Sequence, residues 1–221
     1  MTTILLIRHG ENSFVGKRMA GRLPDVFLNE KGRQQAIGLV TALHKAPIKA
    51  IYSSPLDRAR QTAEPLAQAL GLEVQMAPGI LELDMGDWQG RTLKQLSRLK
   101  AWKTVQSQPS AFRFPGGESF EEAQARAVAE LKAIAERHPE DLVACFSHGD
   151  IIRLVSAYFL DVPLNSFQRL GADTASITVL HLGKDGGVAV PRVNQTLGFE
   201  WPEPKKKAAG SKNGQKQAAN E

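Results

Sequence analysis

Two histidines stand where a buried strand is expected to end. His9 follows the apolar run 4–7 and His148 follows the run 142–146, and a glycine comes directly after each histidine. Open α/β sheets place their ligand sites at the carboxyl ends of strands. A glycine there lets the backbone approach a ligand closely, and the start of a following helix offers free N–H groups to an anion. The pattern therefore predicts an anion-binding site built from two strand ends.

The anion is expected to be a phosphate because arginines lie close by in the sequence. Arg8 precedes His9, and Arg58 lies just past a further predicted strand. A guanidinium group binds phosphoryl oxygens through paired hydrogen bonds and keeps its charge. Flanking cations also lower the pKa of a histidine, which leaves a neutral imidazole able to attack phosphorus. We therefore interpret these residues as a phosphoryl-transfer site.

The hydrophobic pattern that positions these residues alternates between strands and helices. Strands are expected at 4–7, 50–53 and 142–146, and helices after the cap Asn29, over 56–70, over 120–134 and over 151–159. Residues 174–182 and 188–193 predict a closing pair of strands, the second at an edge because it contains Pro191. Pro65 is expected to kink or divide its helix. We predict a single α/β domain, residues 1–202, with a mostly parallel sheet and helices on both faces.

The positive charge of the chain is concentrated in its last residues. The formal net charge is +5, but residues 203–221 hold five lysines and two glutamates, and the rest of the chain carries only +2. This segment has no aromatic residue for base stacking and no apolar periodicity, so it cannot bury a core. We expect a disordered Lys-rich tail and no specific nucleic-acid partner.

The N-terminal apolar run and the cysteine content indicate where in the cell the protein is expected. The apolar run at 4–7 is shorter than a signal-peptide core and much shorter than a membrane span, so no membrane partner is expected. The single cysteine, Cys145, rules out an intrachain disulfide and lies inside an apolar run. It is predicted to be a small buried hydrophobe, and we expect a cytoplasmic location.

From about residue 3 to residue 194, the chain resembles the histidine phosphatase superfamily, also called phosphoglycerate-mutase-like. The resemblance rests on six blocks in the family's order: Arg8-His9-Gly10-Glu11, Leu28-Asn29-Glu30-Lys31-Gly32, Ser53 to Ala63, Leu81-Glu82 with Gly86-Asp87-Trp88-Gln89-Gly90, Pro115-Gly116-Gly117-Glu118-Ser119, and Ser147-His148-Gly149. One such short block arises easily by chance, whereas six in order are specific.

The resemblance implies a role for each matched residue. His9 would be the phosphorylated nucleophile, and Arg8, Arg58 and His148 would hold the phosphoryl oxygens. Glu82 would be the general acid that protonates the leaving oxygen and then the base that activates water, its pKa raised by the bound phosphate. Phosphoryl transfer needs mainly positioning and charge stabilisation, so these side chains are expected to act without a metal or other cofactor.

One position departs from the family pattern. Many members carry Asn four residues after the glutamate of the first block, where its amide helps to bind the phosphoryl group, and this chain has Val15 there. Asn12 or Ser13 of the same loop could substitute, and Asn12 is the phosphate-binding candidate that we carry forward. If Glu82 is not the acid, Glu11 is the next candidate.

The activity implied by the resemblance is that of a phosphomonoesterase acting on a small phosphorylated metabolite. Mutases that resemble this chain carry a longer insertion before the second histidine, with extra arginines and a proline-rich stretch, where this chain has only residues 91–115. The alternatives are a cofactor-dependent phosphoglycerate mutase and, because of Val15, a phosphate-binding regulator without turnover. The phosphorylated substrate is the expected partner, with a homodimer as a candidate assembly.

Other residues that could do chemistry have simpler interpretations. Trp88 is expected to pack the loop that bears Glu82, and Arg153 is expected to form a structural ion pair. A zinc site of His9, His148 and Glu82 is an alternative, but no close-spaced ligand pair such as His-x-x-x-His supports it. No metal site is therefore predicted.

Overall fold

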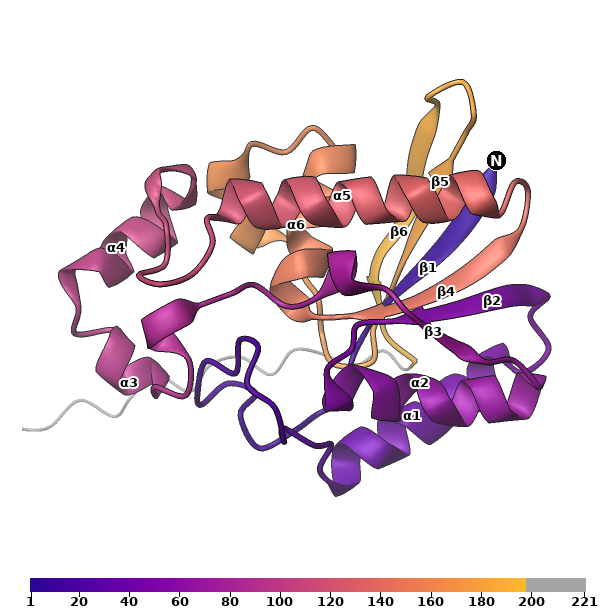
Figure 1. Ribbon diagram of the computed structural model, residues 1–221, viewed down its shortest axis with the longest axis horizontal. Coiled ribbons are helices and arrows are strands. Elements are labelled where there is room, and N and C mark those ends of the chain that lie inside the picture. The colour runs from indigo at the N-terminus through magenta and orange to yellow at the C-terminus, as the bar shows by residue number, and fades with distance from the viewer. Residues whose placement is uncertain (198–221) are drawn as a thin grey trace, which may run out of the picture.

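The computed structural model describes residues 1–197, which form a six-stranded sheet between two layers of helices (Figure 1). The strands are β1 (Thr2–Arg8), β2 (Ile48–Ser53), β3 (Val74–Met76), β4 (Leu142–Ser147), β5 (Ile177–Leu182) and β6 (Val188–Gln195). The α-helices are α1 (Glu30–Leu43), α2 (Asp57–Leu70), α3 (Leu93–Leu96), α4 (Lys100–Ser107), α5 (Phe120–Arg137) and α6 (Gly149–Phe159). Single-turn 3₁₀ segments are η1 (Pro78–Ile80), η2 (Gly86–Trp88) and η3 (Pro109–Ala111), and η4 (Leu164–Arg169) is longer. The predicted tail, 203–221, lies outside the described residues, as do residues 198–202 of the predicted domain.

The strand order in the sheet is β3-β2-β4-β1-β5-β6. The first four strands of this order pair in parallel, whereas β5 is antiparallel to β1 and β6 is antiparallel to β5. The predicted mostly parallel sheet is therefore confirmed. Pro191 lies in β6, an edge strand as predicted, where the missing proline N–H breaks no interior ladder.

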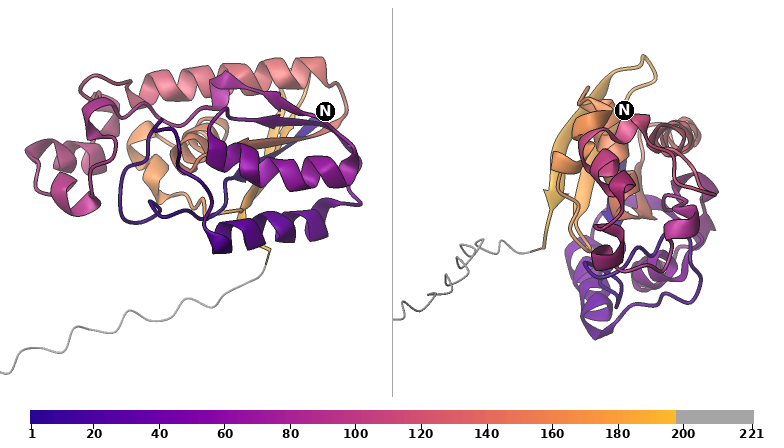
Figure 2. Two further views of the ribbon diagram at one scale, coloured as in Figure 1. Left: turned by 60° about the horizontal axis from the view of Figure 1, so that its bottom comes forward. Right: turned by 90° about the vertical axis from the view of Figure 1, so that its left-hand side faces the viewer.

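The apolar run of β1 is buried on both faces of the sheet. Ile4 and Leu6 join the apolar cluster under α5 and α6, whereas Leu5 and Ile7 join the cluster under α1 and α2. Figures 1 and 2 show these two pairs of helices on opposite sides of the sheet, which confirms the predicted layers. No helix in the described part of the chain is both long enough and apolar enough to cross a bilayer.

The two histidine-bearing strands are neighbours and end at the same level. Arg8 at the end of β1 is in register with Ser147 at the end of β4, and the N–H of His9 donates to the Ser147 carbonyl at 2.9 Å. His9 and His148 therefore leave the sheet side by side. β2, on the other side of β4, leads into α2 and so brings Arg58 to the same edge.

Pro65 does not divide its helix, and one short strand was not expected. α2 runs undivided across Pro65, because proline removes one helical hydrogen bond while Thr62, Ala63 and Leu66 stay buried on the same helix. β3 was not predicted at all. It has only three residues and none of them is fully buried, so it carries almost no apolar pattern.

Residues 91–115 form a helical lobe, containing α3, α4 and η3, beside the sheet (Figure 1). Trp88 anchors this lobe: its ring stacks on Trp102 at 6.1 Å between centroids and also contacts Phe112 and Phe114. Trp88 is 3% exposed, and its ring contacts are to this lobe, whereas we expected it to pack the loop that bears Glu82.

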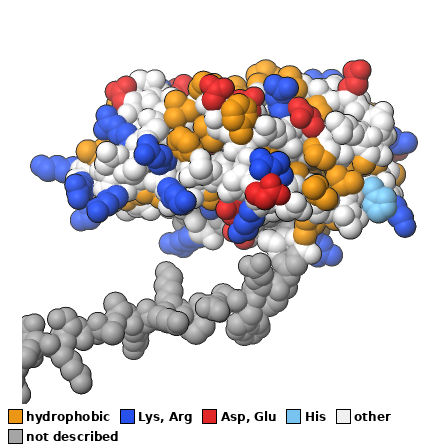
Figure 3. Space-filling model, turned by 90° about the horizontal axis from the view of Figure 1, so that it is seen from below, with side chains coloured by type: hydrophobic (Ala, Val, Ile, Leu, Met, Phe, Trp, Pro, Cys, Tyr) orange, Lys and Arg blue, Asp and Glu red, His pale blue; other side chains and the backbone are white. Residues whose placement is uncertain are grey.

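The surface of this lobe is cationic. No Asp or Glu lies between Asp87 and Glu118, and Figure 3 shows Lys and Arg side chains gathered at this end of the molecule. The exposed cations of α3, α4 and their flanks are Arg91, Lys94, Arg98, Lys100 and Lys103. The lobe therefore presents a positive field to any anion that approaches this end.

Candidate active site

His9 is held with one ring nitrogen tied to the backbone. Its Nδ1 lies 2.7 Å from the carbonyl oxygen of Gly10. A carbonyl only accepts, so in the neutral ring Nδ1 carries the proton and Nε2 keeps a lone pair. His9 is 4% exposed and lines a pocket of about 180 Å³ at the carboxyl edge of the sheet. The ring thus combines a fixed orientation with a nitrogen available for chemistry.

Electrostatics keep this ring neutral. Burial, together with the charges of Arg58 and Arg8, holds the pKa of His9 well below its ordinary value. A neutral imidazole at pH 7 is the state that attacks phosphorus. The expected effect of the flanking arginines is present, and burial is the larger cause.

His148 faces His9 across the two strand ends, with 5.3 Å between ring centroids. Its Nε2 lies 2.7 Å from the hydroxyl of Ser54, whereas its Nδ1 is buried without a hydrogen-bond partner among residues 1–197. Burial, Arg58 and His9 hold the pKa of His148 well below its ordinary value, so this ring is also neutral. His148 therefore brings a polar atom that only a further group at the site can satisfy.

Arg8 and Arg58 are each anchored through one nitrogen and keep the others unused. Nη1 of Arg8 donates to the Ala172 carbonyl at 2.6 Å, and Nη2 of Arg58 donates to the Gly21 carbonyl at 2.7 Å. Nε of Arg8, and both Nε and Nη1 of Arg58, are buried and unpartnered among the described residues. The anchors fix the guanidinium planes while leaving donors for a ligand.

The two glycines that follow the histidines are needed for packing inside the protein. A Cβ on Gly149 would lie 3.2 Å from the guanidinium carbon of Arg8, so this glycine makes room for the arginine. A Cβ on Gly10 would lie 2.6 Å from the carbonyl oxygen of Gly32, so Gly10 allows close contact with α1. Both glycines are thus required for close packing inside the protein, and Gly149 also lines the pocket, so close approach to a ligand stays a prediction.

Unsatisfied donors are concentrated at this site. Of the five buried side-chain polar atoms without a partner in the described part of the chain, four belong to Arg8, Arg58 and His148. Buried polar groups in proteins are almost always hydrogen-bonded, so such a cluster points to a ligand. Two guanidinium groups and an imidazole suit the oxygens of a phosphoryl group.

Glu82 lies in the loop between η1 and η2 and lines the same pocket as His9. Its Oε1 accepts from the N–H of Leu83 at 3.0 Å. Burial, followed by the negative charge of Asp150, raises the pKa of Glu82 to about 7. A carboxyl group with this pKa can give and take a proton near neutral pH.

Asn12 and Val15 both line the pocket, whereas Ser13 is exposed and does not. Asn12 is 3% exposed, and its Oδ1 accepts from the N–H of Phe14 at 2.9 Å. This leaves the amide nitrogen as the donor end of Asn12. Val15 presents only methyl groups, so the donor of the family pattern is lost at that position.

Two further acidic or basic candidates have structural partners. Glu11 does not line the pocket, because its carboxylate contacts Asn29 at 3.1 Å and Lys31 at 3.0 Å. Arg153 pairs with Asp150 at 3.1 Å, as predicted, and both of these residues also line the pocket. Within residues 1–197, no three His, Cys, Asp or Glu side chains are grouped so as to hold a metal ion.

Sequence reasoning does not single out Ser54 and Thr62. Ser54 reaches His148, and the hydroxyl of Thr62 accepts from the N–H of Gly10 at 2.9 Å and donates to the Arg58 carbonyl at 2.7 Å. Thr62 thereby joins α2 to the turn that bears the first histidine. The only available signal was that both hydroxyls lie in the block from residue 53 to residue 63.

A larger cavity of about 760 Å³ lies between α5, α6 and the β5–β6 hairpin. Lys132, Tyr158 and Val188 are among its lining residues, and none of the predicted site residues is. Arg8, His9, Asn12, Arg58 and Glu82 line the smaller pocket instead, whereas His148 lines neither.

Comparison with known proteins agrees with this geometry. The sequence model of the histidine phosphatase superfamily (branch 1) matches residues 4–196. Phosphoserine phosphatase 1 of Hydrogenobacter thermophilus is 32% identical over 186 residues, which cover 82% of this chain and 87% of that protein. Glucosyl-3-phosphoglycerate phosphatase of Mycobacterium tuberculosis is 35% identical over 183 residues, which cover 76% of this chain and 79% of that protein.

Solved structures and longer relatives complete the comparison. YhfR of Bacillus stearothermophilus superposes with a TM-score of 0.83 at 29% identity, over 89% of this chain and 98% of that one. A bifunctional protein of M. tuberculosis is 31% identical over 201 residues, but the chain spans only 54% of its length. With the family model matching nearly all described residues, the chain belongs to the histidine phosphatase superfamily, branch 1.

Proposed function

We propose that this chain is a phosphomonoesterase that hydrolyses a small phosphorylated metabolite through a phosphohistidine on His9. The proposal is carried by one observation: buried side-chain nitrogens of Arg8, Arg58 and His148, which have no partner among residues 1–197, lie close to a neutral imidazole. These donors suit a phosphoryl group, and Nε2 of His9 has the electron pair that attacks it.

In the first step, the Nε2 lone pair of His9 attacks phosphorus and the bond from phosphorus to the leaving oxygen breaks. Glu82 gives its proton to that oxygen, so the product leaves as a neutral alcohol. Arg8, Arg58 and His148 donate to the phosphoryl oxygens, where charge accumulates in the transition state.

In the second step, water attacks the phosphorus of the phosphohistidine and the nitrogen–phosphorus bond breaks. The Glu82 carboxylate takes a proton from the water, inorganic phosphate leaves, and Nε2 recovers its lone pair. Asn12 adds a donor from its amide nitrogen in both steps. The two arginines supply the positive charge, so the proposed reaction needs no metal.

The substrate is proposed to be a small phosphorylated acid. Two relatives are named for phosphoserine and for glucosyl-3-phosphoglycerate, both of which carry acidic groups besides the phosphate. The pocket of about 180 Å³ has Leu93 of the cationic lobe in its lining, so an anionic substrate would approach through a favourable field. A homodimer and a cytoplasmic location stay predictions.

The test is a screen of the purified protein against phosphorylated metabolites, with release of inorganic phosphate as the readout. We expect turnover of one or more phosphorylated acids, no loss with a chelator, and inhibition by vanadate, which resembles the pentacoordinate transition state. Activity that is lost with chelator and restored by zinc or magnesium would contradict the proposed charge stabilisation.

The same screen separates the alternatives. A mutase would interconvert phosphoglycerates, with a rate that rises on addition of 2,3-bisphosphoglycerate. A regulator would bind inorganic phosphate yet release none from any substrate, including an aryl phosphate. Val15 is the reason to include this last arm, because it removes a donor from the pocket.

A further inference from the structure

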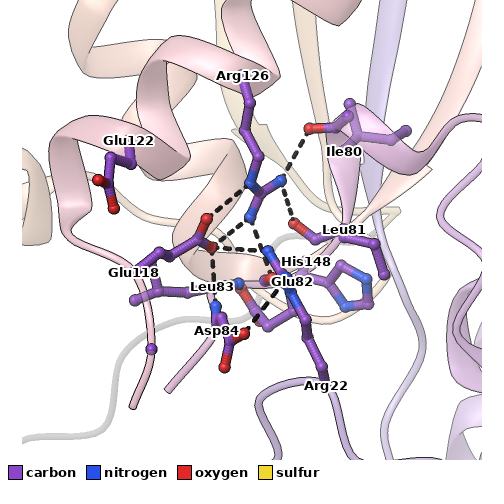
Figure 4. A network of polar contacts seen from close by, with 12 residues as sticks. Arg22, Ile80, Leu81, Glu82, Leu83, Asp84, Glu118, Glu122, Arg126 and His148 are labelled. Atoms are coloured by element: carbon purple, nitrogen blue, oxygen red, sulfur yellow. Dashed lines mark hydrogen bonds and ion pairs between the residues drawn. The ribbon is translucent and has the colours of Figure 1, made fainter. Parts of the chain in front are cut away.

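An arginine of α5 binds the backbone of the loop that bears Glu82. Arg126 donates through Nη1 to the carbonyls of Gly79 and Leu81, at 2.8 Å each, and through Nη2 to the carbonyl of Glu82 at 3.1 Å. Figure 4 shows this guanidinium group directed at the loop. Because Glu82 lies between two single-turn segments, in neither a helix nor a strand, these bonds replace regular structure in fixing its backbone.

A second arginine, from the segment between β1 and α1, donates to the same carbonyl. Nε of Arg22 donates to the carbonyl oxygen of Glu82 at 3.0 Å, and its Nη1 lies 3.4 Å from the carboxylate of Asp84. Arg22 directly follows Gly21, which lines the pocket and holds the Arg58 side chain. It therefore links the loop of the general acid to the segment that frames the phosphate site.

Glu118 joins the two arginines. Its carboxylate accepts from Nε and Nη2 of Arg126 at 3.0 and 2.6 Å, and from Nη2 of Arg22 at 3.0 Å. It also accepts from the N–H of Asp84 at 2.8 Å. Although burial opposes ionisation, hydrogen bonds from Arg126 and Asp84 hold the pKa of Glu118 below its ordinary value. One ionised carboxylate thus orients both guanidinium groups.

We propose that Arg22, Glu118 and Arg126 are positioning residues for the proton transfer by Glu82. This inference rests on the proposed function, because it gives Glu82 the role of general acid. Proton transfer requires the carboxyl oxygen within about 3 Å of the leaving oxygen, and a misplacement of about 1 Å costs up to about a hundredfold in rate. Neither arginine touches the substrate pocket as Glu82 does; each acts on the backbone that carries the acid.

The experiment compares two substrates in matched variants. Arg126→Gln and Arg22→Gln are assayed on the best alkyl phosphate of the screen, whose leaving oxygen needs a proton, and on 4-nitrophenyl phosphate, which leaves without one. We expect kcat for the alkyl phosphate to fall about tenfold more than kcat for the aryl phosphate. Arg137→Gln is the control, because it removes an exposed ion pair, to Glu130, from the same helix as Arg126. It should lower neither rate.

A merely structural role would reduce both rates equally and lower the melting temperature, which would overturn the inference. If Arg126→Gln does not fold, Arg22→Gln still tests the inference. The Arg22 side chain is 31% exposed, and its loss leaves the hydrogen bonds of Arg126 in place. In both variants, the alkaline limb of the pH profile should also shift, because the environment of Glu82 changes.

Glu82→Gln, alone and combined with Arg126→Gln, separates the two ideas being tested. If Arg126 acts through Glu82, the selective loss on the alkyl phosphate is absent from the combined variant relative to Glu82→Gln. A further selective loss in that background would overturn the positioning role while leaving Glu82 as the acid. No selective loss in Glu82→Gln itself would overturn the assignment of the acid, and the inference with it.

Discussion

His9 and His148 come from neighbouring strand ends, precede a glycine, and have pKa values lowered by burial and by Arg58. Their hydrogen bonds nevertheless leave opposite ring nitrogens available. His9 is tied through Nδ1 to a backbone carbonyl, which leaves Nε2 with a lone pair, whereas His148 is tied through Nε2 to Ser54, which leaves Nδ1.

The shared His-Gly dipeptide does not distinguish the proposed nucleophile, His9, from the proposed phosphoryl donor, His148, but this difference in hydrogen bonding does. His9 lines the pocket and is slightly exposed, whereas His148 is completely buried and does not line it. If the Ser54 hydroxyl donates to Nε2 of His148, the proton of the neutral ring sits on Nδ1 and makes that atom a donor. The same dipeptide thus supplies a nucleophile at one strand end and a phosphoryl donor at the other.

The largest effect is expected from removing the nucleophile. His9→Ala should reduce phosphate release at least about 10⁴-fold, because no neighbouring group can form the covalent intermediate. The variant should keep its circular dichroism spectrum and lose the acid-labile phosphate that mass spectrometry detects on the wild type. More than a few per cent of the wild-type rate would break the assignment of Nε2 as the attacking atom.

A pH profile tests whether both histidines are neutral while Glu82 titrates. Their pKa values lie well below 6.5, and the pKa of Glu82 is about 7, so the alkaline limb belongs to the carboxyl group alone. Loss of its proton removes the acid, so kcat/KM for an alkyl phosphate should fall about tenfold per pH unit above about 7.

In Glu82→Gln, this limb should disappear and the alkyl rate should fall roughly 10²–10⁴-fold, with a smaller loss on an aryl phosphate. An unchanged alkaline limb in the variant would assign it to another group. Any acid limb near pH 6 is expected to include the second ionisation of the phosphate ester itself. Comparing two substrates with different ester pKa values identifies that contribution.

Replacing the second histidine should give a smaller loss than replacing the first. His148→Ala removes one donor to the phosphoryl oxygens, which costs roughly 10²–10³-fold in kcat, but leaves Nε2 of His9 able to attack. Slow formation of phosphohistidine on His9 should still be visible in a single-turnover experiment. Phosphate label in His9→Ala but not in His148→Ala would reverse the two roles.

Sequence patterns predicted the elements that deliver the site because those elements are strongly periodic or strongly capped. The runs that became β1 and β4 are buried on both faces, and the Asn29 side chain caps α1 by accepting from the N–H of Gly32. Adjacent parallel strands then place their carboxyl ends together. The meeting of His9 with His148 follows from these local features and the topology of the sheet.

What the sequence patterns did not predict depends on contacts between distant segments. Ser54 and His148 are 94 residues apart, and Arg126 reaches the Glu82 carbonyl across 44 residues. No local periodicity reports such pairs. The α3–α4 lobe was missed for a related reason, because its helices are short and are stabilised by packing on Trp88 rather than by a long apolar face.

The smallest effect tests what orients His148. Ser54→Ala removes the hydroxyl that lies 2.7 Å from Nε2 of His148, so the neutral ring is no longer held with its proton on Nδ1. A hydrogen bond of this kind contributes about 1 kcal/mol, which corresponds to about a fivefold loss of kcat/KM. Ser53→Ala is the matched control, since Ser53 is equally buried but donates to the Ser54 carbonyl and does not reach the imidazole.

The two serine variants separate an effect on His148 from an effect on the fold. Both remove one buried hydroxyl at the end of β2, so both should lower the melting temperature by a similar amount. Only Ser54→Ala should weaken inhibition by vanadate, because only it alters a donor to the phosphoryl oxygens. Combined with His148→Ala, the Ser54 substitution should have no further effect on kcat/KM, since the ring that it orients is gone. An additive loss would mean that Ser54 contacts the substrate directly, and the hydrogen bond to Nε2 would then not be what distinguishes the second histidine from the first.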